Sequence, residues 1–403
     1  MNHRVLLPLF GLALLTTLAV GCQTAAPPLL ATGFDTDPLA AGWTVTAAGE
    51  ERPGNGRWLP PGGGAPGSIA CGVGGWEAPA LPITPFQCYR VRYAALAPQP
   101  AYVFVRFYRA DGSEVAADDH TELPASATWQ PREFCFVGRA DATTVRLGFQ
   151  ARTAELRLAS VRVEPVSPRV ALAWAEQMAA DLPPVAPTLA PDRWRLLPRT
   201  RARLAAGQPL RIVLLGDSIA NDLGNSLFHL RVARAWGSGP IELIHSVRSG
   251  TGCTYYRQAG RVQEYVLRYQ PDLLIVAGIS TNTDAAAIRD VVQQARAGGV
   301  PEVAVFTGAI SMRGMAWRYK TIADLPEDVR RQAETQDATF RARLAADCAA
   351  DGVAFFDLRA EWERFLASTT QPRSSFTRDI THANDRGKQV IGLLATAFLA
   401  PAR

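Results

Sequence analysis

A serine, an aspartate and a histidine in this sequence have the types and neighbours that nucleophilic attack by a serine requires. Ser218 stands in Leu214-Leu215-Gly216-Asp217-Ser218-Ile219, where a glycine turn directly follows an apolar run. A serine hydroxyl is a weak nucleophile until a base removes its proton, so a histidine must approach it. Near the other end of the chain, Asp379 and His382 stand in Arg378-Asp379-Ile380-Thr381-His382. Nε2 of His382 would take the serine proton, and Asp379 would hold Nδ1–H.

Of the five histidines, His382 meets this requirement best. His3 lies in the leader and His120 in the first half of the chain. His229 and His245 have no carboxylate at a similar spacing. We therefore predict a catalytic triad of Ser218, Asp379 and His382.

The chain from residue 196 to residue 403 alternates apolar β-type runs with helical stretches. Such alternation is typical of a parallel sheet covered on both faces. Right-handed crossovers would make this a flavodoxin-like, three-layer α/β/α domain with a five-stranded parallel sheet. The expected strands are Arg211–Leu215, Ile241–His245, Asp272–Ala277, Glu302–Thr307 and Val353–Phe356. The expected helices include Ala285–Ala297, Glu327–Ala350 and Asp385–Phe398.

This scaffold would bring the three residues to one place. Ser218 follows the first expected strand, and the loop with Asp379 and His382 follows the fifth. Loops at the C-terminal ends of parallel strands share one edge of the sheet, so the hydroxyl and the imidazole can meet there. Ser218 also opens a helix, whose N–H groups and positive dipole end stabilise negative charge.

Residues 32–166 have the pattern of an all-β domain. Short runs rich in β-branched and aromatic residues alternate with loops of Pro, Gly and Asp, which predicts a sandwich or jelly roll. The runs are Cys88–Ala94, Tyr102–Tyr108, Arg132–Val137, Thr144–Gln150 and Glu155–Val163. Gly33-Phe34-Asp35 and the last run resemble the galactose-binding-like jelly rolls of carbohydrate-binding modules. Helical spacing and a cluster of prolines predict a helix and a semi-rigid linker over residues 167–195.

The N-terminus has the pattern of an export signal. A short positive segment, Met1 to Arg4, precedes an apolar stretch that ends in Ala19-Val20-Gly21-Cys22. The stretch is short for a membrane-spanning helix and suits a signal peptide. Cys22 after a small residue resembles the lipobox of bacterial lipoproteins, which implies a signal peptide at 1–21, a lipidated Cys22 and a tether at 22–31. The alternative is an ordinary cleaved signal peptide with an accidental cysteine.

The blocks around Ser218 and around Asp379 and His382 resemble the first and last signature blocks of the SGNH (GDSL-like) hydrolase family. The likeness covers about residues 197–401. The turn differs from the Gly-x-Ser-x-Gly elbow of α/β-hydrolases, because Ala220 stands where the second glycine would be. The resemblance implies an oxyanion hole built from the N–H of Ser218, a glycine N–H after the second strand and an asparagine after the third.

The glycine of this expected oxyanion hole is Gly250, with Gly252 as the second choice. The third block departs from the family pattern, since Ser280 stands at the asparagine position and Asn282 lies two residues further on. Loss of one oxyanion donor costs about 3 kcal/mol of transition-state stabilisation. Either Ser280 or Asn282 supplies this donor, and we favour Ser280 by position.

Composition argues against several other functions. The net charge is +5, but no basic run is dense enough for nucleic acid. We find no metal-ligand spacing and no nucleotide-binding glycine loop, so no cofactor is expected. Any disulfide would join two of Cys71, Cys88 and Cys135, whereas Cys253 and Cys348 are expected to pack in the core. The tryptophans of the β domain form either a sugar-stacking platform or core; they are Trp43, Trp58, Trp76 and Trp129.

These patterns together predict a serine esterase that acts on acyl groups, above all O-acetyl, of a carbohydrate outside the cytoplasm. The partners would be the acylated carbohydrate, or another small ester, and a membrane reached through Cys22, at the periplasmic face or surface of a bacterial envelope. One alternative is a lipase or thioesterase for longer acyl chains. Another is a glycan-binding lipoprotein whose hydrolase domain has decayed. The oligomeric state stays open.

Overall fold

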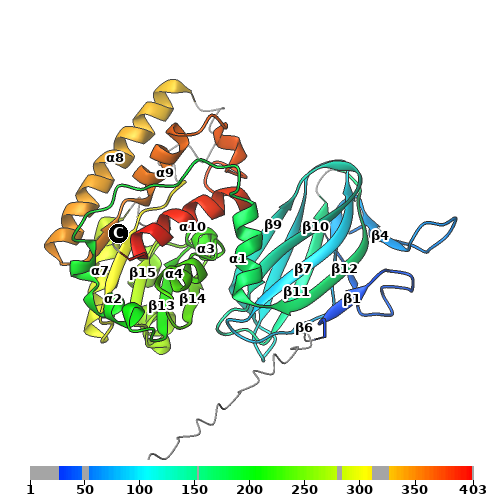
Figure 1. The fold of residues 1–403 in the computed structure, drawn as a ribbon, viewed down its shortest axis with the longest axis horizontal. Coiled ribbons are helices and arrows are strands. Elements are labelled where there is room, and N and C mark those ends of the chain that lie inside the picture. Colours follow the sequence, from blue (N-terminus) through cyan, green and yellow to red (C-terminus); the bar gives the residue numbers. More distant parts are fainter. Residues whose placement is uncertain (1–26, 48–53, 152–153, 279–283, 311–325, 402–403) are drawn as a thin grey trace, which may run out of the picture.

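The computed structural model describes residues 27–47, 54–151, 154–278, 284–310 and 326–401, which form a β domain beside an α/β domain (Figure 1). The strands of the β domain are β1 (Leu30–Thr32), β2 (Thr44–Thr46), β3 (Arg57–Leu59), β4 (Ser68–Cys71), β5 (Gly74–Glu77), β6 (Leu81–Pro82), β7 (Cys88–Ala97), β8 (Ala101–Tyr108), β9 (Glu114–Leu123), β10 (Ser126–Val137), β11 (Thr144–Ala151) and β12 (Leu156–Val166). They form two antiparallel sheets, in the orders β10-β7-β12-β4-β3 and β2-β5-β11-β8-β9. β1 joins the first sheet beside β12, and β6 joins the second beside β11.

The alternation of side chains along β8 explains how this sandwich closes. Successive residues of a strand point to opposite faces of its sheet. Val103, Val105 and Phe107 are fully buried between the sheets, whereas Tyr102 and Phe104 point outward. The predicted sandwich is therefore present, with longer strands than the sequence indicated and with β1 to β6 and β9 as additions.

The tryptophans of this domain do not form a common stacking surface. Trp43 and Trp76 are buried in the sandwich core. Nε1 of Trp58 donates to the backbone oxygen of Phe34, and Trp129 is the exposed member of the set. Of the two interpretations open from sequence, core packing applies to Trp43 and Trp76.

The α/β domain has a parallel sheet in the order β14-β13-β15-β16-β17. Its strands are β13 (Leu210–Gly216), β14 (Ile241–Val247), β15 (Leu273–Val276), β16 (Val303–Phe306) and β17 (Ala354–Phe356). The helices are α2 (Pro198–Ala205), α3 (Ser218–Gly224), α4 (Phe228–Trp236), α5 (Cys253–Tyr256), α6 (Arg261–Tyr265), α7 (Ala285–Ala297), α8 (Glu327–Ala350), α9 (Leu358–Ala367) and α10 (Asp385–Leu399). This is the strand order of flavodoxin-like folds, in which ligands bind beyond the C-terminal strand ends where the order reverses.

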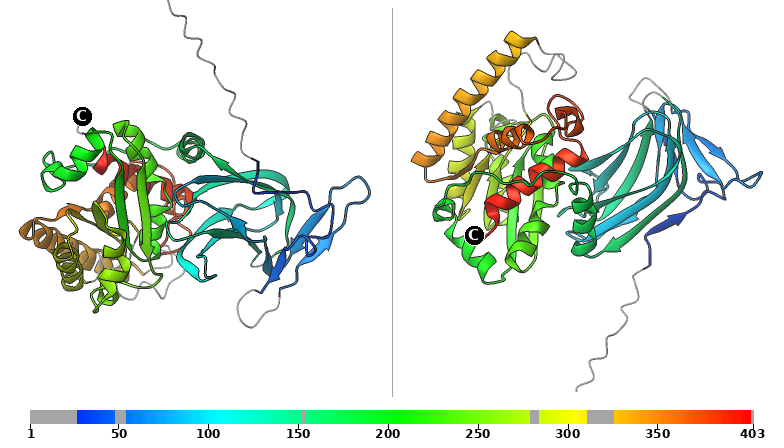
Figure 2. Two further views of the ribbon diagram at one scale, coloured as in Figure 1. Left: turned by 90° about the horizontal axis from the view of Figure 1, so that it is seen from below. Right: turned by 45° about the horizontal axis from the view of Figure 1, so that its top comes forward.

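The sheet is buried on both faces because its strands are apolar throughout. Ile212 and Leu214 of β13 pack into one cluster with α4, α9 and α10. Val213 and Leu215 pack into a second cluster with α5, α6, α7 and α8. The three predicted layers are thus present, with helices on both faces of the parallel sheet (Figure 2).

The two domains are in direct contact. Helix α1 (Pro168–Gln177) packs against β10, where Nε1 of Trp174 donates to the backbone oxygen of Glu133 at 3.2 Å. Its buried face belongs to one apolar cluster that runs from the sandwich core into α4 and α10. The proline-rich segment that follows lies on the α/β domain, where the N–H of Thr188 donates to Oε2 of Glu361 at 3.1 Å.

In the described part, Cys71, Cys88, Cys135 and Cys348 are free and buried, and Cys253 is buried as well. Burial raises the pKa of Cys71 and Cys88 to about 11, and the pKa of Cys135 and Cys348 to about 12. These four thiols are therefore not activated nucleophiles. Within the same described part, no helix has the length and apolarity needed to cross a bilayer.

Candidate active site

Ser218 is the first residue of α3 and directly follows the N-cap residue Asp217. The Asp217 side chain accepts hydrogen bonds from the N–H groups of Ile219 at 2.9 Å and Ala220 at 3.4 Å. An aspartate in this position stabilises a helix start by about 1 kcal/mol. The acid before the serine therefore fixes the direction of the helix that carries the hydroxyl.

Gly216 ends β13 at a point where no side chain fits. A Cβ there would lie 2.3 Å from the backbone oxygen of Ala277 and 2.6 Å from Cβ of Ala220. The carbonyl of Gly216 accepts a hydrogen bond from the buried Tyr256 hydroxyl at 2.5 Å. The glycine is needed for close approach of β13, β15 and α3.

The loop with the predicted acid and base is closed by its own backbone. The N–H of Arg378 donates to the oxygen of His382, and the N–H of Asn384 donates to the oxygen of Phe376, both at 3.1 Å. Oδ1 of Asn384 then caps α10 by accepting from the N–H of Gly387 at 2.9 Å. The loop is thus held at both ends, directly before a buried helix.

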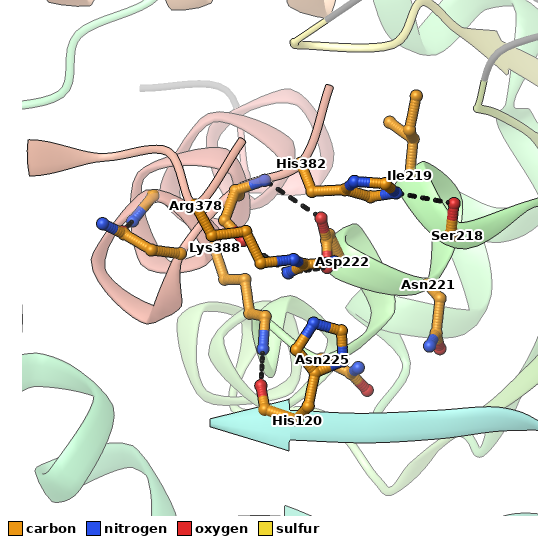
Figure 3. Close-up of polar contacts among 12 residues, drawn as sticks. His120, Ser218, Ile219, Asn221, Asp222, Asn225, Arg378, His382 and Lys388 are labelled. Atoms are coloured by element: carbon orange, nitrogen blue, oxygen red, sulfur yellow. Dashed lines mark hydrogen bonds and ion pairs between the residues drawn. The ribbon is translucent and has the colours of Figure 1, made fainter. Parts of the chain in front are cut away.

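Ser218, His382 and Asp379 form one chain of hydrogen bonds. Ser218 Oγ lies 2.8 Å from Nε2 of His382, although 164 residues separate them in sequence (Figure 3). Nδ1 of His382 lies 2.8 Å from Oδ2 and 3.0 Å from Oδ1 of Asp379. This is the nucleophile–base–carboxylate geometry that activates a serine hydroxyl. The structure therefore brings together all three residues of the predicted triad.

The Asp379 carboxylate is held in its ionised form. Oδ1 accepts from the N–H groups of Thr381 and His382, each at 2.8 Å, and from the Thr381 hydroxyl at 3.1 Å. Burial raises the pKa of Asp379, but these N–H donors and the His382 ring together hold that pKa well below its usual range. A permanent negative charge beside Nδ1 favours the tautomer that leaves Nε2 free to accept the serine proton.

Asp222, four residues after the nucleophile on α3, connects the two parts of the triad. Its Oδ1 lies 3.0 Å from Nη1 of Arg378, and its Oδ2 accepts from the N–H of Ala383 at 3.0 Å. The pair is almost fully buried, with 8% of the Arg378 side chain and 4% of the Asp222 side chain exposed. Asp222 therefore binds the histidine loop on both sides of Asp379 and His382, a role that sequence reasoning missed.

Both domains line the cleft in front of Ser218. Its volume is about 380 Å³, and its walls come from α3, from the histidine loop, from Ser249 after β14, and from β8 and β9. The β domain contributes Tyr102, Phe104, Asp118 and His120. His120, to which sequence reasoning gave no role, points from β9 toward α3 (Figure 3). The sequence signal that could have revealed this wall of the cleft is the pair Tyr102 and Phe104, which alternate with buried residues on β8.

A buried polar network joins the β domain to the helix of the nucleophile. The guanidinium of Arg139 lies 2.5 Å from Oδ1 of Asn225 and 3.4 Å from Nε2 of His245. Nδ1 of His245 lies 3.1 Å from Oδ1 of Asn221, whose Nδ2 donates to the backbone oxygen of Asp118 at 2.5 Å. Burial lowers the pKa of Arg139 to about 10 and the pKa of His245 well below 6.5. The network therefore places a charged guanidinium beside a neutral imidazole beneath α3.

A second buried group ties β9 to α10. Nζ of Lys388 lies 3.2 Å from Oδ1 of Asp119, 3.1 Å from Oδ1 of Asp385 and 2.5 Å from the backbone oxygen of His120. Oδ2 of Asp385 in turn accepts from the N–H of Glu122 at 3.1 Å. Two carboxylates and a carbonyl compensate the buried ammonium, so the cleft wall on β9 is fixed relative to α10.

The remaining predicted site residues have different outcomes. Gly250 follows Ser249 in the loop after β14 and has a φ of 65°, a backbone conformation that favours glycine. Ser249, and not Gly250, is among the residues that line the cleft. Ser280, Asn282 and Cys22 lie outside the described residues, so their roles remain predictions. Within the described part, no group of three or more His, Cys, Asp or Glu side chains is arranged to hold a metal ion.

Comparison with known proteins yields partial resemblances. No family model matches this chain, and no curated protein matches it. A two-domain esterase active on acetylated mannans is 15% identical, with a TM-score of 0.38 over 51% of this chain and 52% of that chain. A xylan-binding domain from Paenibacillus barcinonensis is 13% identical, with a TM-score of 0.28 over 36% of this chain and 97% of that chain. A tailspike protein of bacteriophage CBA120 is 14% identical, with a TM-score of 0.28, over 33% of this chain but only 20% of its own length.

Proposed function

We propose that this chain is a serine esterase of the SGNH type that removes acyl groups, above all O-acetyl, from a carbohydrate outside the cytoplasm. The observation that carries the proposal is the pair of 2.8 Å contacts from His382, to Ser218 Oγ through Nε2 and to Asp379 through Nδ1. Both Ser218 and His382 line an open cleft, so a substrate can reach them.

In the proposed reaction Ser218 Oγ attacks the ester carbonyl while Nε2 of His382 takes its proton. Asp379 stabilises the imidazolium that forms. The imidazolium then protonates the leaving alkoxide of the sugar, which leaves an acyl-serine. A water molecule, deprotonated by His382, attacks the acyl-serine and releases the acid. The N–H groups of Ser218 and Gly250, with Ser280 or Asn282, are proposed to hold the oxyanion.

The lining of the cleft supports a short acyl group over a long one. Most of the described residues that line it carry charged or polar side chains, among them Asp118, Asn221, Asp222 and Arg378. A long acyl chain needs an apolar groove, and this lining offers its methylenes few apolar side chains. A lipase or thioesterase is therefore the weaker proposal.

The chemistry is tested by comparing wild type with Ser218→Ala on short-chain aryl esters and on acetylated mannan and xylan. We expect the variant to lose at least ~10³-fold in kcat, because a missing nucleophile leaves only binding and oxyanion contributions. Ser160 lies on β12, in the sheet of the β domain that does not contain β8 and β9. Ser160→Ala is therefore the matched control and should leave the rate unchanged. Equal rates for wild type and Ser218→Ala would refute the proposal.

The membrane anchor is a separate proposal that rests on the lipobox resemblance. Lipidation of Cys22 would hold the enzyme at the cell envelope through acyl chains. In cells, Cys22→Ser should move the protein from the membrane fraction to the soluble fraction while the specific activity is kept. An unchanged distribution would refute the anchor and leave the esterase proposal intact.

A further inference from the structure

The wall of the cleft that faces the nucleophile belongs to the β domain. Tyr102 and Phe104 alternate with buried residues on β8 and point out of the sandwich, and His120 lies across from Phe104 on β9. The register pairs Phe104 with His120, so their side chains share one face of the sheet. Outward aromatic residues on this strand are thus placed against the α/β domain.

The three rings form one continuous surface. The ring centroids of Tyr102 and Phe104 lie 6.3 Å apart with an interplanar angle of 32°, and those of Phe104 and His120 lie 5.9 Å apart at 41°. All three residues line the cleft and are only partly exposed. Flat, partly exposed rings beside a reactive serine suit a ligand that has a flat apolar face.

The chemistry of ester cleavage decides which part of a substrate meets this wall. The leaving oxygen must come within about 3 Å of Nε2 of His382 to receive its proton. The alcohol part of the ester therefore lies on the His382 side of the serine, whereas the carbonyl oxygen turns toward the oxyanion donors. His120 lines the same cleft as His382 and Asp379, so an alcohol group placed beside His382 lies within that shared cleft.

Polar groups at this wall match the hydroxyls of a sugar. Asp118 lies two residues before His120 on β9 and lines the same cleft. Burial and the nearby charges of Lys388 and Arg378 lower the pKa of His120 to about 2, so its imidazole is neutral. A neutral imidazole donates one hydrogen bond and accepts another, and a carboxylate accepts from hydroxyls.

We propose that Tyr102, Phe104 and His120 form the subsite for the pyranose ring that carries the ester, with Asp118 as a further hydroxyl acceptor. This rests on the proposed esterase function and assigns the β domain to substrate recognition inside the active site itself. The sugar stacks on the two aromatic rings with its ester oxygen directed at His382. An ester of a small aliphatic alcohol does not use this subsite.

The test compares two acetate esters that differ only in the alcohol, an O-acetylated methyl mannopyranoside and ethyl acetate. For Tyr102→Ala and Phe104→Ala we expect kcat/KM on the sugar ester to fall about tenfold each, mainly through KM, because each variant loses one ring contact. On ethyl acetate the change should stay below about threefold. Tyr102→Phe keeps the ring and should retain activity on the sugar ester.

Tyr108→Ala is the matched control, since Tyr108 points outward on the same strand but does not line the cleft. Thermal melting of each variant separates loss of recognition from loss of folding. An equal fall on both esters, or no fall on the sugar ester, would overturn the subsite. Neither result would touch the esterase proposal, which depends on the separate comparison of wild type with Ser218→Ala.

Discussion

Asp222 on α3 and Arg378 in the histidine loop form a buried ion pair, with Oδ1 and Nη1 3.0 Å apart. One residue belongs to the helix that begins with Ser218, and the other directly precedes Asp379. Because Asp222 also accepts from the N–H of Ala383, the loop is held at two points. The Ser218–His382 distance therefore depends on a contact that takes no part in proton transfer.

Removal of Asp222 should damage both stability and rate. Asp222→Ala removes the nearest carboxylate of the buried Arg378 guanidinium, and loss of one member of a buried ion pair typically costs about 3–5 kcal/mol. A loop displaced by about 1 Å lowers kcat by ~10²-fold. Urea unfolding and steady-state kinetics measure the two effects. Asp290→Ala is the control, because its ion pair with Arg257 has both side chains more than 40% exposed and should contribute less than about 1 kcal/mol.

Asp379→Asn should abolish most of the activity without unfolding the protein. The amide keeps the shape of the carboxylate but donates where Asp379 accepts, so His382 takes the wrong tautomer and kcat falls by ~10⁴-fold. Since the pKa of Asp379 is held well below its usual range, its protonation should not produce an acid limb in the pH–rate profile of wild type. A variant that keeps a tenth of the wild-type kcat would contradict this role.

Lys388→Met should weaken the junction between the domains. The substitution leaves Asp119 and Asp385 without their shared ammonium, and loss of one member of a buried ionic group costs about 3–5 kcal/mol. Because Nζ also binds the backbone oxygen of His120, KM for the sugar ester should rise as β9 shifts. Arg386→Met, which alters a more exposed ion pair on the same helix, should have a much smaller effect on the melting temperature.

Acid should destabilise the fold through buried neutral histidines. Burial lowers the pKa of His229 to about 3, and it lowers the pKa of His245 well below 6.5. In the unfolded chain both rings bind a proton as the pH falls through 6.5, whereas in the folded chain they stay neutral. Stability is therefore full above that pH and is lost below it, by ~1.4 kcal/mol per pH unit for each ring.

His229→Gln should reduce the slope of unfolding free energy against pH between 6 and about 4 by the contribution of one proton. Urea unfolding at a series of pH values measures that slope. An unchanged slope would show that His229 titrates normally in the folded state.

The β domain shows which strands a local sequence pattern can predict and which it cannot. β7, β8 and β11 were predictable because buried and outward residues alternate along them. β9 was not, because Asp118-Asp119-His120 lacks the composition of a strand. Lys388 compensates the carboxylate of Asp119, and Asn221 and Asp385 bind backbone groups of this strand; all three follow more than a hundred residues later. The residue pattern of one segment does not indicate partners that lie so far away in the sequence.

The sequence alone indicated the alternating strands and helices of the α/β domain, the serine turn and the loop of Asp379 and His382, because these depend on apolar runs and on contacts between near neighbours. Only the tertiary structure decided that Asp222 holds the histidine loop and that Tyr102, Phe104 and His120 face the serine. Those contacts join residues far apart in the chain. The Asp222 contacts form when α3 and the histidine loop pack together within the α/β domain, and the ring residues face the serine only when the two domains bury a common surface. Such packing has no periodic signature along the chain, since it depends on which faces meet.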